Sequence, residues 1–229
     1  MTASSRRAAR PRVGIVAAAG SGERLGADVP KALVDCGGQR LFTWSVEALA
    51  AVCDRVIVAV PPDLRLEIRE AALEQIAGGS SRSASVREAV RSAPDAAVYV
   101  VQDAARPLLS AELVEACCEQ VEAGWDGAVA AAPVSDTIKA VDGDGRVVET
   151  LDRSRLWAIQ TPQAFDGAAL RAALEVDDRT LAAATDDAAL VEARGGSITI
   201  VPAPAENIKV TTRADLAFAE LLLAPRVER

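Results

Sequence analysis

The sequence predicts an α/β protein built on a doubly wound, mostly parallel sheet. Short apolar runs of strand length alternate along the chain with longer amphipathic segments of helix length. The first three apolar runs are nearly continuous in valine, isoleucine and alanine, which is typical of strands covered by helices on both faces. The 229 residues suffice for one large α/β domain.

The expected strands are 13–18, 55–60, 97–102, 127–132 and 197–201. The expected helices between and after them are 41–51, 63–77, 83–93, 110–123 and 213–223. Ser110 and Thr212 are suited to cap two of these helices, whose first turns carry Glu112 and Asp215. Ligands of doubly wound sheets bind at the carboxyl ends of the strands, so the polar residues that follow each strand are candidates for a site.

One segment departs from this alternation. Two short, half-apolar runs at 137–141 and 146–151 flank the sequence Asp-Gly-Asp-Gly at 142–145, which indicates a β-hairpin. An isolated two-stranded ribbon is marginally stable in water, so we expect a partner surface to support it. We therefore interpret residues 136–156 as a projecting arm that forms a dimer contact.

Composition excludes several classes of function. The chain has no histidine, which excludes Ser-His-Asp and Cys-His catalysis as well as His-ligated zinc. A net charge of −8 and 3% aromatic residues do not suit a nucleic-acid binder. The four cysteines show no C-x-x-C spacing, so we expect free, buried thiols and a reducing compartment; they are Cys36, Cys53, Cys117 and Cys118.

The ends and the hydropathy of the chain favour a cytoplasmic protein. No apolar stretch approaches the roughly 18 residues of a membrane span. The arginine-rich start at 1–12 lacks the apolar segment of a secretory signal, and we expect it to be a disordered tail. A single domain is expected to follow over 13–229, with no contact to membranes or nucleic acid.

A glycine-rich loop follows the first expected strand. It reads AAAGSGERLG over residues 17–26, and Pro30 and Lys31 come shortly after it. Such a loop exposes backbone N–H groups to a polyphosphate, but the spacing fits neither the dinucleotide fingerprint nor the Walker motif. Arg24 and Lys31 could hold a triphosphate where charge develops during group transfer. The alternative is two surface cations on a solvated loop.

Three further polar segments follow expected strands or precede expected helices. The third apolar run ends at Asp103, where a metal or a hydroxyl partner is expected, and Arg106 could pair with a phosphate or with Asp103 itself. The sequence GGSSRSAS at 78–85 precedes a helix and offers N–H and hydroxyl groups to a base or an anion. Lys209 adds another cation beside a strand-like segment.

In this order, the segments resemble one family, the 2-C-methyl-D-erythritol 4-phosphate cytidylyltransferases of the non-mevalonate isoprenoid pathway. The matching pieces are AAAGSGERL (17–25), PK (30–31), GGSSRSASV (78–86), DAARP (103–107), AAPVSDTIK (131–139), LDRSRLWAIQTPQAF (151–165), TDDAA (185–189) and NIKVT (207–211). They span nearly the whole chain. The resemblance implies a Rossmann-like fold of the nucleotidyltransferase type with a projecting hairpin arm, and a homodimer formed through that arm.

The resemblance also implies a reaction and residue roles. CTP and methylerythritol 4-phosphate would give a CDP-alcohol and pyrophosphate, with Mg2+ held mainly by the CTP phosphates and Asp103 as a candidate ligand. The implied catalytic residues are Arg24, Lys31, Arg153 and Lys209. The implied nucleotide-binding residues are Ala18, Ala19, Gly20, Gly22, Gly79, Ser80, Ser85 and Ala104. The implied polyol-binding residues are Asp103, Arg106, Thr137 and Thr161, with Thr137 and Arg153 reaching the partner's substrate from the arm.

The sequence departs from the family pattern at two positions and is compatible with other functions. Ser80 and Gln102 stand where many members carry Asp and His. A ribitol 5-phosphate cytidylyltransferase would share the CTP machinery, and a non-catalytic CTP-binding module could keep the fold. The sequence Asp142-x-Asp144 resembles the D-x-D of some glycosyltransferases, but its place between glycines favours a turn.

Overall fold

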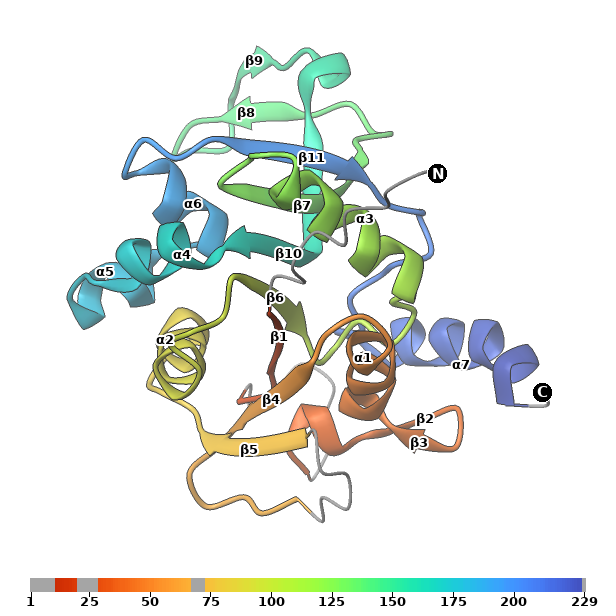
Figure 1. Ribbon diagram of the computed structural model, residues 1–229. Coiled ribbons are helices and arrows are strands. Elements are labelled where there is room, and N and C mark those ends of the chain that lie inside the picture. Colours follow the sequence, from red (N-terminus) through yellow and green to blue (C-terminus); the bar gives the residue numbers. More distant parts are fainter. Residues whose placement is uncertain (1–10, 20–28, 67–72, 228–229) are drawn as a thin grey trace, which may run out of the picture.

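The computed structural model describes residues 11–19, 29–66 and 73–227, which form a seven-stranded sheet with helices on both faces (Figure 1). The strand order is β11-β7-β10-β6-β1-β4-β5. Only β10 runs antiparallel to its neighbours in this sheet, so the expected α/β class with a mostly parallel sheet is confirmed. The strands are β1 (Arg12–Ala17), β4 (Arg55–Val60), β5 (Leu73–Ala77), β6 (Val98–Asp103), β7 (Gly127–Pro133), β10 (Trp157–Asp166) and β11 (Ile198–Pro202).

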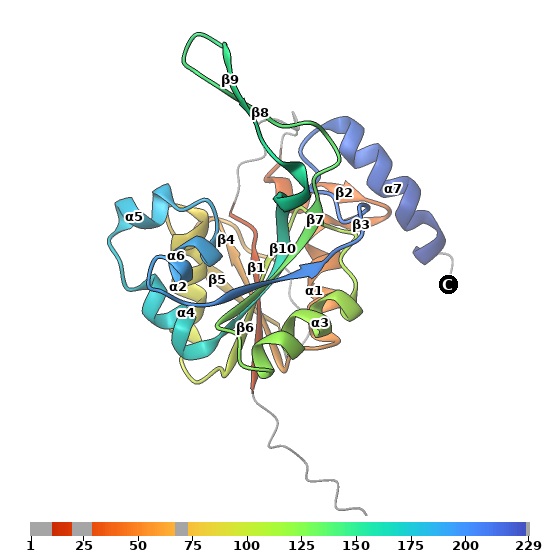
Figure 2. The same cartoon turned by 90° about the horizontal axis from the view of Figure 1, so that it is seen from above.

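The helices form two layers, one on each face of the sheet (Figure 2). On one face, α1 (Leu41–Ala50) packs against β1 and β4 with Leu49 buried, and α3 (Ala111–Glu122) packs against β7 and β10 with Val114 buried. The other face is covered by α2 (Arg82–Ser92), α4 (Gly167–Leu174), α5 (Asp178–Ala183) and α6 (Asp187–Glu192). Burial of both faces explains why the strand sequences are nearly continuous in apolar residues.

Smaller elements complete the chain. The last helix, α7 (Arg213–Val227), packs beside the short strands β2 (Asp35–Cys36) and β3 (Gln39–Arg40). Two single 3-10 turns are η2 (Lys31–Leu33) and η3 (Arg153–Arg155). The expected caps are confirmed, because Ser110 accepts the N–H of Leu113 at 3.3 Å and Thr212 accepts that of Asp215 at 3.2 Å. Within the described ranges, no helix is long and apolar enough to cross a membrane.

The prediction of a helix over 63–77 is wrong. Residues 73–77 form the edge strand β5, which pairs in parallel with β4, and residues 63–66 contain no helix. The intervening residues 67–72 lie outside the described part of the chain. The apolar spacing of this segment is compatible with a helix, but the open edge of β4 offers backbone partners and Arg55 pairs with Glu74 at 2.8 Å. Tertiary pairing therefore overrides local preference.

The antiparallel strand β10 was not expected, because its sequence lacks the continuous apolar pattern of a buried strand. Gln160, Thr161 and Gln163 break the apolar pattern, and Pro162 argues against the interior of a sheet. The structure accommodates these residues with a register shift between Ile159 and Gln163, where pairing with β7 is interrupted. The same shift brings the polar side chains of β10 to the end of the sheet at which β6 finishes.

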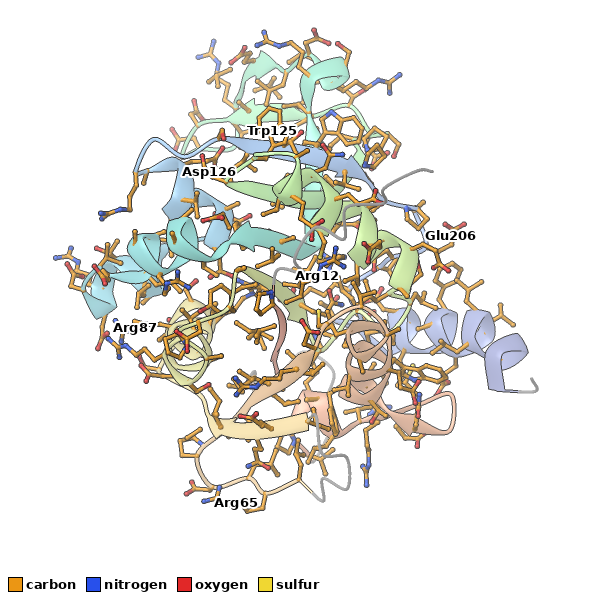
Figure 3. All side chains as sticks on the ribbon, viewed as in Figure 1. Arg12, Arg65, Arg87, Trp125, Asp126 and Glu206 are labelled. Carbon is orange, nitrogen blue, oxygen red and sulfur yellow. The ribbon has the colours of Figure 1, made fainter. Side chains whose placement is uncertain are left out.

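The first strand starts at Arg12, inside the segment expected to be a tail. Arg12 pairs with Val98 of β6, and its guanidinium donates to Glu115 and Glu122 of α3 at 2.7 and 2.8 Å. Figure 3 labels Arg12 at this junction beside α3. The expected tail therefore does not extend to Arg12, and its residues 1–10 lie outside the described ranges.

The expected hairpin is present. Strands β8 (Lys139–Val141) and β9 (Val147–Thr150) pair antiparallel and extend away from the central sheet (Figure 2). Asp142 closes the turn, since its Oδ1 accepts the N–H groups of Asp144 and Arg146 at 3.1 and 2.9 Å. The D-x-D sequence thus serves a turn, as its place between glycines indicated. Val141, Val147 and Val148 are each more than half exposed on the arm.

All four cysteines are free and buried, as expected. Burial raises the pKa of Cys117 from 9.0 to about 12, and the neighbouring Cys118 adds to this effect. Burial raises the pKa of Cys118 to about 12 as well, although the positive charge of Arg12 opposes it. These thiols stay protonated in the folded state at pH values where the unfolded chain has already released its protons.

We therefore expect stability to fall as the pH rises above 9. Between pH 9 and 12 the unfolded state binds fewer protons than the folded state, so each such thiol lowers the free energy of unfolding by up to about 1.4 kcal/mol per pH unit. Urea unfolding at pH 8, 9 and 10 measures this slope. In Cys117→Ala the slope should become shallower than in the unsubstituted protein, and an unchanged slope would contradict the assignment.

Candidate active site

The candidate residues gather where the strand order reverses, at the carboxyl ends of β1 and β6. From β1 the sheet continues through β4 and β5 on one side and through β6 on the other. The backbone N–H of Ala18 donates to the Ala59 carbonyl at 2.9 Å, and that of Ala104 donates to the Ala17 carbonyl at 3.3 Å. The ends of three parallel strands are thereby held together, at the place where doubly wound sheets bind ligands.

The loop after β5 is built for close backbone approach. A Cβ atom on Gly78 would lie 3.1 Å from the Ala19 Cβ and 2.8 Å from the Ser85 Oγ. On Gly79 it would lie 2.6 Å from the Ala84 Cβ. Because neither position has room for a side chain, glycine lets this loop pack between the end of β1 and the start of α2.

The Ser85 hydroxyl shapes this loop. It accepts the Gly79 N–H at 3.1 Å and donates to the Ser81 carbonyl at 2.9 Å, and the whole residue is buried. The donor of this hydroxyl is thus already engaged. Ser80, in contrast, is exposed at the head of the loop.

Asp103, the last residue of β6, lies at the centre of a charged cluster. Its Oδ1 accepts a hydrogen bond from Arg82 Nε at 2.9 Å, and its Oδ2 accepts one from Lys209 Nζ at 2.7 Å. Arg82 also donates through Nη1 to Asp187 Oδ2 at 2.6 Å. Four charged groups from β6, α2, α6 and the segment after β11 therefore form one chain, in the order Asp187, Arg82, Asp103, Lys209.

These contacts set the charges of the cluster. Burial alone would raise the pKa of the Asp103 carboxyl, but the positive charges of Arg82 and Lys209 hold it well below its usual value. Burial would likewise lower the pKa of Arg82, and the charges of Asp187 and Asp103 raise it instead. Asp103 is therefore an anion throughout the physiological range, and it cannot act as a general acid.

Arg106 was expected to pair either with a phosphate or with Asp103. It forms no ion pair with Asp103. Its Nη1 donates to the Asn207 carbonyl at 2.7 Å, and the residue is almost entirely buried. Its Nε has no hydrogen-bond partner among the described residues. Burial lowers the pKa of the guanidinium, with a partial opposing effect of the Asp103 charge. Arg106 thus brings a cation with an unused donor to the cluster.

Residues of β10 and of the segment after β11 support this arrangement. The Asp103 N–H donates to Thr161 Oγ1 at 3.1 Å, which ties the end of β6 to β10. Asn207 is fully buried and donates to Gln160 Oε1 at 2.8 Å and to the Thr161 carbonyl at 2.9 Å. These bonds fix the segment that carries Lys209 against the sheet.

The remaining expected site residues fall into two groups. Lys31 opens η2 and is half-buried, whereas Gly20, Gly22 and Arg24 lie outside the described residues. Thr137 and Arg153 are exposed on the arm, where Arg153 Nη1 donates to the Ser135 carbonyl at 2.6 Å. No described contact joins these two arm residues to the Asp103 cluster of the same chain.

Sequence reasoning missed Arg82 and Asp187. Both lie within segments that were singled out, GGSSRSAS and TDDAA, so their presence near the site was visible. Their pairing was not, because 105 residues separate them and only the tertiary fold brings the start of α2 to the start of α6. A fully buried carboxylate such as Asp187 is rare without a partner, and Arg82 is that partner.

The donor set suits a metal ion carried by phosphates more than a cage made of protein alone. In the described ranges there is no group of three or more Cys, Asp or Glu side chains able to hold a metal. Mg2+ is commonly bound by one or two carboxylates together with substrate phosphates and water. Asp103 is the carboxylate at the end of β6, and both of its oxygens already accept from cations.

A mostly parallel sheet with a glycine-bearing loop and several cations at its carboxyl ends defines an α/β protein of the nucleotidyltransferase type. A family model described as 2-C-methyl-D-erythritol 4-phosphate cytidylyltransferase matches residues 13–225. The chain belongs to the 2-C-methyl-D-erythritol 4-phosphate cytidylyltransferase family.

Individual relatives agree with this assignment. The protein of that name from Frankia casuarinae is 45% identical over 223 residues, which cover 94% of this chain and 83% of the relative. Its counterpart from Saccharopolyspora erythraea is 43% identical over 228 residues, covering 93% and 99%. The crystal structure of 2-C-methyl-D-erythritol 4-phosphate cytidylyltransferase from Thermus thermophilus matches with a TM-score of 0.79 at 33% identity, covering 93% and 98% of the two chains.

Proposed function

We propose that this protein transfers CMP from CTP to 2-C-methyl-D-erythritol 4-phosphate, giving 4-diphosphocytidyl-2-C-methyl-D-erythritol and pyrophosphate. The observation that carries the proposal is the set of cations around Asp103. Arg82, Arg106 and Lys209 gather there although the chain as a whole has a net charge of −8. Such local positive charge suits a site that must bind two anionic substrates at once.

The chemistry of this transfer needs no histidine. An oxygen of the substrate phosphate forms the new bond to the α-phosphorus of CTP, and the bond to the β-phosphate breaks with its electron pair leaving on pyrophosphate. The attacking oxygen is already an anion, so no base has to remove a proton from it. Catalysis then consists of bringing two anions together and stabilising the charge of in-line displacement.

Each part of the site has a role in this proposal. Ala18, Ala19, Gly20, Gly22, Gly79, Ser80, Ser85 and Ala104 bind the nucleotide. Arg24, Lys31 and Lys209 stabilise the phosphates, and Asp103, Arg106 and Thr161 contact the polyol. Support for the nucleotide site comes from the loop after β5, where Gly78 and Gly79 have no room for a Cβ.

Mg2+ is part of this proposal as an ion carried by the CTP phosphates, with Asp103 as a candidate protein ligand. When bound, it would neutralise charge on the phosphates during transfer. On the protein side, the cations Arg24, Lys31 and Lys209 would hold and orient the phosphates.

We further propose that the protein works as a homodimer through its arm. The arm exposes Val141, Val147 and Val148, and the neighbouring start of β10 exposes Trp157 and Ile159. Val141 and Val147 are paired across the hairpin, and grouped exposed apolar residues mark an interaction surface. Thr137 and Arg153 would then reach the substrate in the partner's site. The free, buried thiols suit a reducing compartment, which supports a cytoplasmic location.

The reaction can be tested by following phosphorus in the product. Purified protein with Mg2+, CTP and methylerythritol 4-phosphate should form a compound with two coupled diphosphate signals in the 31P NMR spectrum, together with free pyrophosphate. A mixture that keeps both substrates unchanged at high enzyme concentration would refute the proposed activity.

A smaller test addresses the nucleotide loop. In Gly79→Ala the new Cβ would lie 2.6 Å from the Ala84 Cβ, so the loop has to move away from α2 and lose its hydrogen bond to Ser85. We expect CTP affinity measured by calorimetry to fall about tenfold, the size of effect typical of one lost contact with a charged ligand. Gly143→Ala is the control, because its Cβ meets nothing within 4 Å. Equal affinities of both variants would argue against this loop as the nucleotide site.

A further inference from the structure

The two cations that contact Asp103 differ in how firmly they are held. At one end, Arg82 is fixed through two of its nitrogens, to Asp103 at 2.9 Å and to the fully buried Asp187 at 2.6 Å. At the other end, Lys209 is 41% exposed, and the described residues give its ammonium one partner, Asp103 Oδ2 at 2.7 Å. Arg82 is therefore held in place, whereas Lys209 sits on a flexible stem with a single contact.

This asymmetry decides which cation can leave Asp103. A buried carboxylate that loses its last counter-ion is strongly destabilised, because an uncompensated charge stays in a medium of low dielectric. While Arg82 remains, the departure of Lys209 leaves Asp103 with one strong, charge-assisted hydrogen bond. Asp187, Arg82, Asp103 and Lys209 together carry no net charge, so Asp103 holds Lys209 without an excess of negative charge, and the buried Arg106 nearby adds one positive charge.

We propose that Arg82, anchored by Asp187, is a positioning residue that allows Lys209 to move from Asp103 to a phosphate oxygen of the bound substrates. This inference rests on the proposed function and deepens it. Arg82 acts through Asp103 and Lys209 and need not touch the substrates itself. When Lys209 moves, Asp103 Oδ2 becomes available to accept a hydrogen bond from a substrate hydroxyl, so capture of the phosphate and of the polyol is coupled.

Asp187 has no other described function that explains its burial. Its Oδ2 accepts from Arg82, and its Oδ1 has no partner among the described residues. Burial of a carboxylate costs desolvation free energy. A role in orienting Arg82 explains why Asp187 is nevertheless buried. Its neighbour Asp186 already serves as the N-cap of α6, accepting the Ala189 N–H at 2.9 Å, so Asp187 is not needed for capping.

The test is a double-mutant cycle on binding of inorganic pyrophosphate, measured by calorimetry. In the unsubstituted protein, Lys209→Ala should weaken binding about tenfold, as expected for loss of one charge-assisted contact. In the Arg82→Gln background the same replacement should change binding less than about twofold, because Lys209 is then retained by Asp103 as its remaining counter-ion. Arg82→Lys keeps the positive charge, so in this background Lys209→Ala should again weaken pyrophosphate binding by most of the original factor.

Controls separate positioning from folding. Arg87→Gln removes a guanidinium from the same helix, where Arg87 pairs with Asp178 at 2.7 Å on the outer surface (Figure 3), and should leave the Lys209 effect at its original size. Thermal unfolding identifies any variant that does not fold. Should Arg82→Gln not fold, Asp187→Asn takes its place in the cycle, with a reduced Lys209 effect expected for the same reason.

The outcomes are distinct from those that test the reaction. Equal effects of Lys209→Ala in both backgrounds, or no effect in either, overturn the positioning role of Arg82. Turnover of CTP by the unsubstituted protein in that case leaves the proposed function intact. Loss of the proposed function would instead appear as absence of turnover in the unsubstituted protein.

Discussion

Lys31→Ala is expected to lower kcat by at least about a hundredfold while weakening CTP binding much less, because the cation acts on charge that develops only during transfer. Lys31 opens η2, shortly after the glycine-rich loop, and the proposed function assigns it, together with Arg24, to the phosphates. Single-turnover kinetics, together with CTP affinity from calorimetry, separates the two effects. Arg24→Ala is expected to behave in the same way.

The matched control removes a loop cation elsewhere. Arg65 lies in an exposed loop and donates to the carbonyls of Pro62 and Leu64, so Arg65→Ala should leave turnover unchanged. Ordinary turnover in Lys31→Ala would show that this residue does not stabilise the transferring phosphate. A loss of CTP affinity as large as the loss of kcat would assign it to ground-state binding instead.

Arg153→Ala is expected to impair the use of the polyol phosphate strongly and to leave CTP affinity nearly unchanged. Arg153 is exposed on η3 at the base of the arm, and it donates to the carbonyl of Ser135, just before the arm, at 2.6 Å. Its cation would face an anionic substrate in the partner subunit. The KM for methylerythritol 4-phosphate and the Kd for CTP, measured on the same preparation, distinguish these effects.

Mixing two inactive variants tests the shared site directly. Arg153→Ala has an intact core, and Lys31→Ala has an intact arm, so a mixed dimer would contain one complete site. Random exchange of subunits at equal amounts should restore about a quarter of the original activity, because half of the dimers are mixed and each has one working site of two. Mixtures that stay inactive after proven subunit exchange would place Arg153 and Lys31 in the same chain's site, or the arm outside it.

The sequence predicted the parts of the fold that depend on local pattern. Strands β1, β4 and β6 are buried on both faces, so their apolar runs were unambiguous. The hairpin arm was visible because its turn chemistry is strong. Strand β10 was missed because polar residues and a proline interrupt its apolar pattern. The edge strand β5 was missed because the apolar spacing that leads into it is compatible with a helix.

The site was predictable to the extent that its residues follow strands. Asp103 and Lys209 were both singled out, and the structure brings them to 2.7 Å from each other across 106 residues of sequence. Arg82 and Asp187 were missed for a physical reason. Their significance lies in a pairing between α2 and α6 that no local pattern encodes. Ser85 illustrates the converse, since its hydroxyl lies at the expected place but bonds to the loop itself.

Pyrophosphate release with Mg2+ and each of CTP, ATP, GTP and UTP shows which nucleotide the protein uses. Methylerythritol 4-phosphate and ribitol 5-phosphate are offered separately as acceptors. We expect release with CTP and methylerythritol 4-phosphate and little with any other combination. Preferential release with ribitol 5-phosphate would contradict the assigned acceptor, and silence with both acceptors despite CTP binding would contradict catalysis itself.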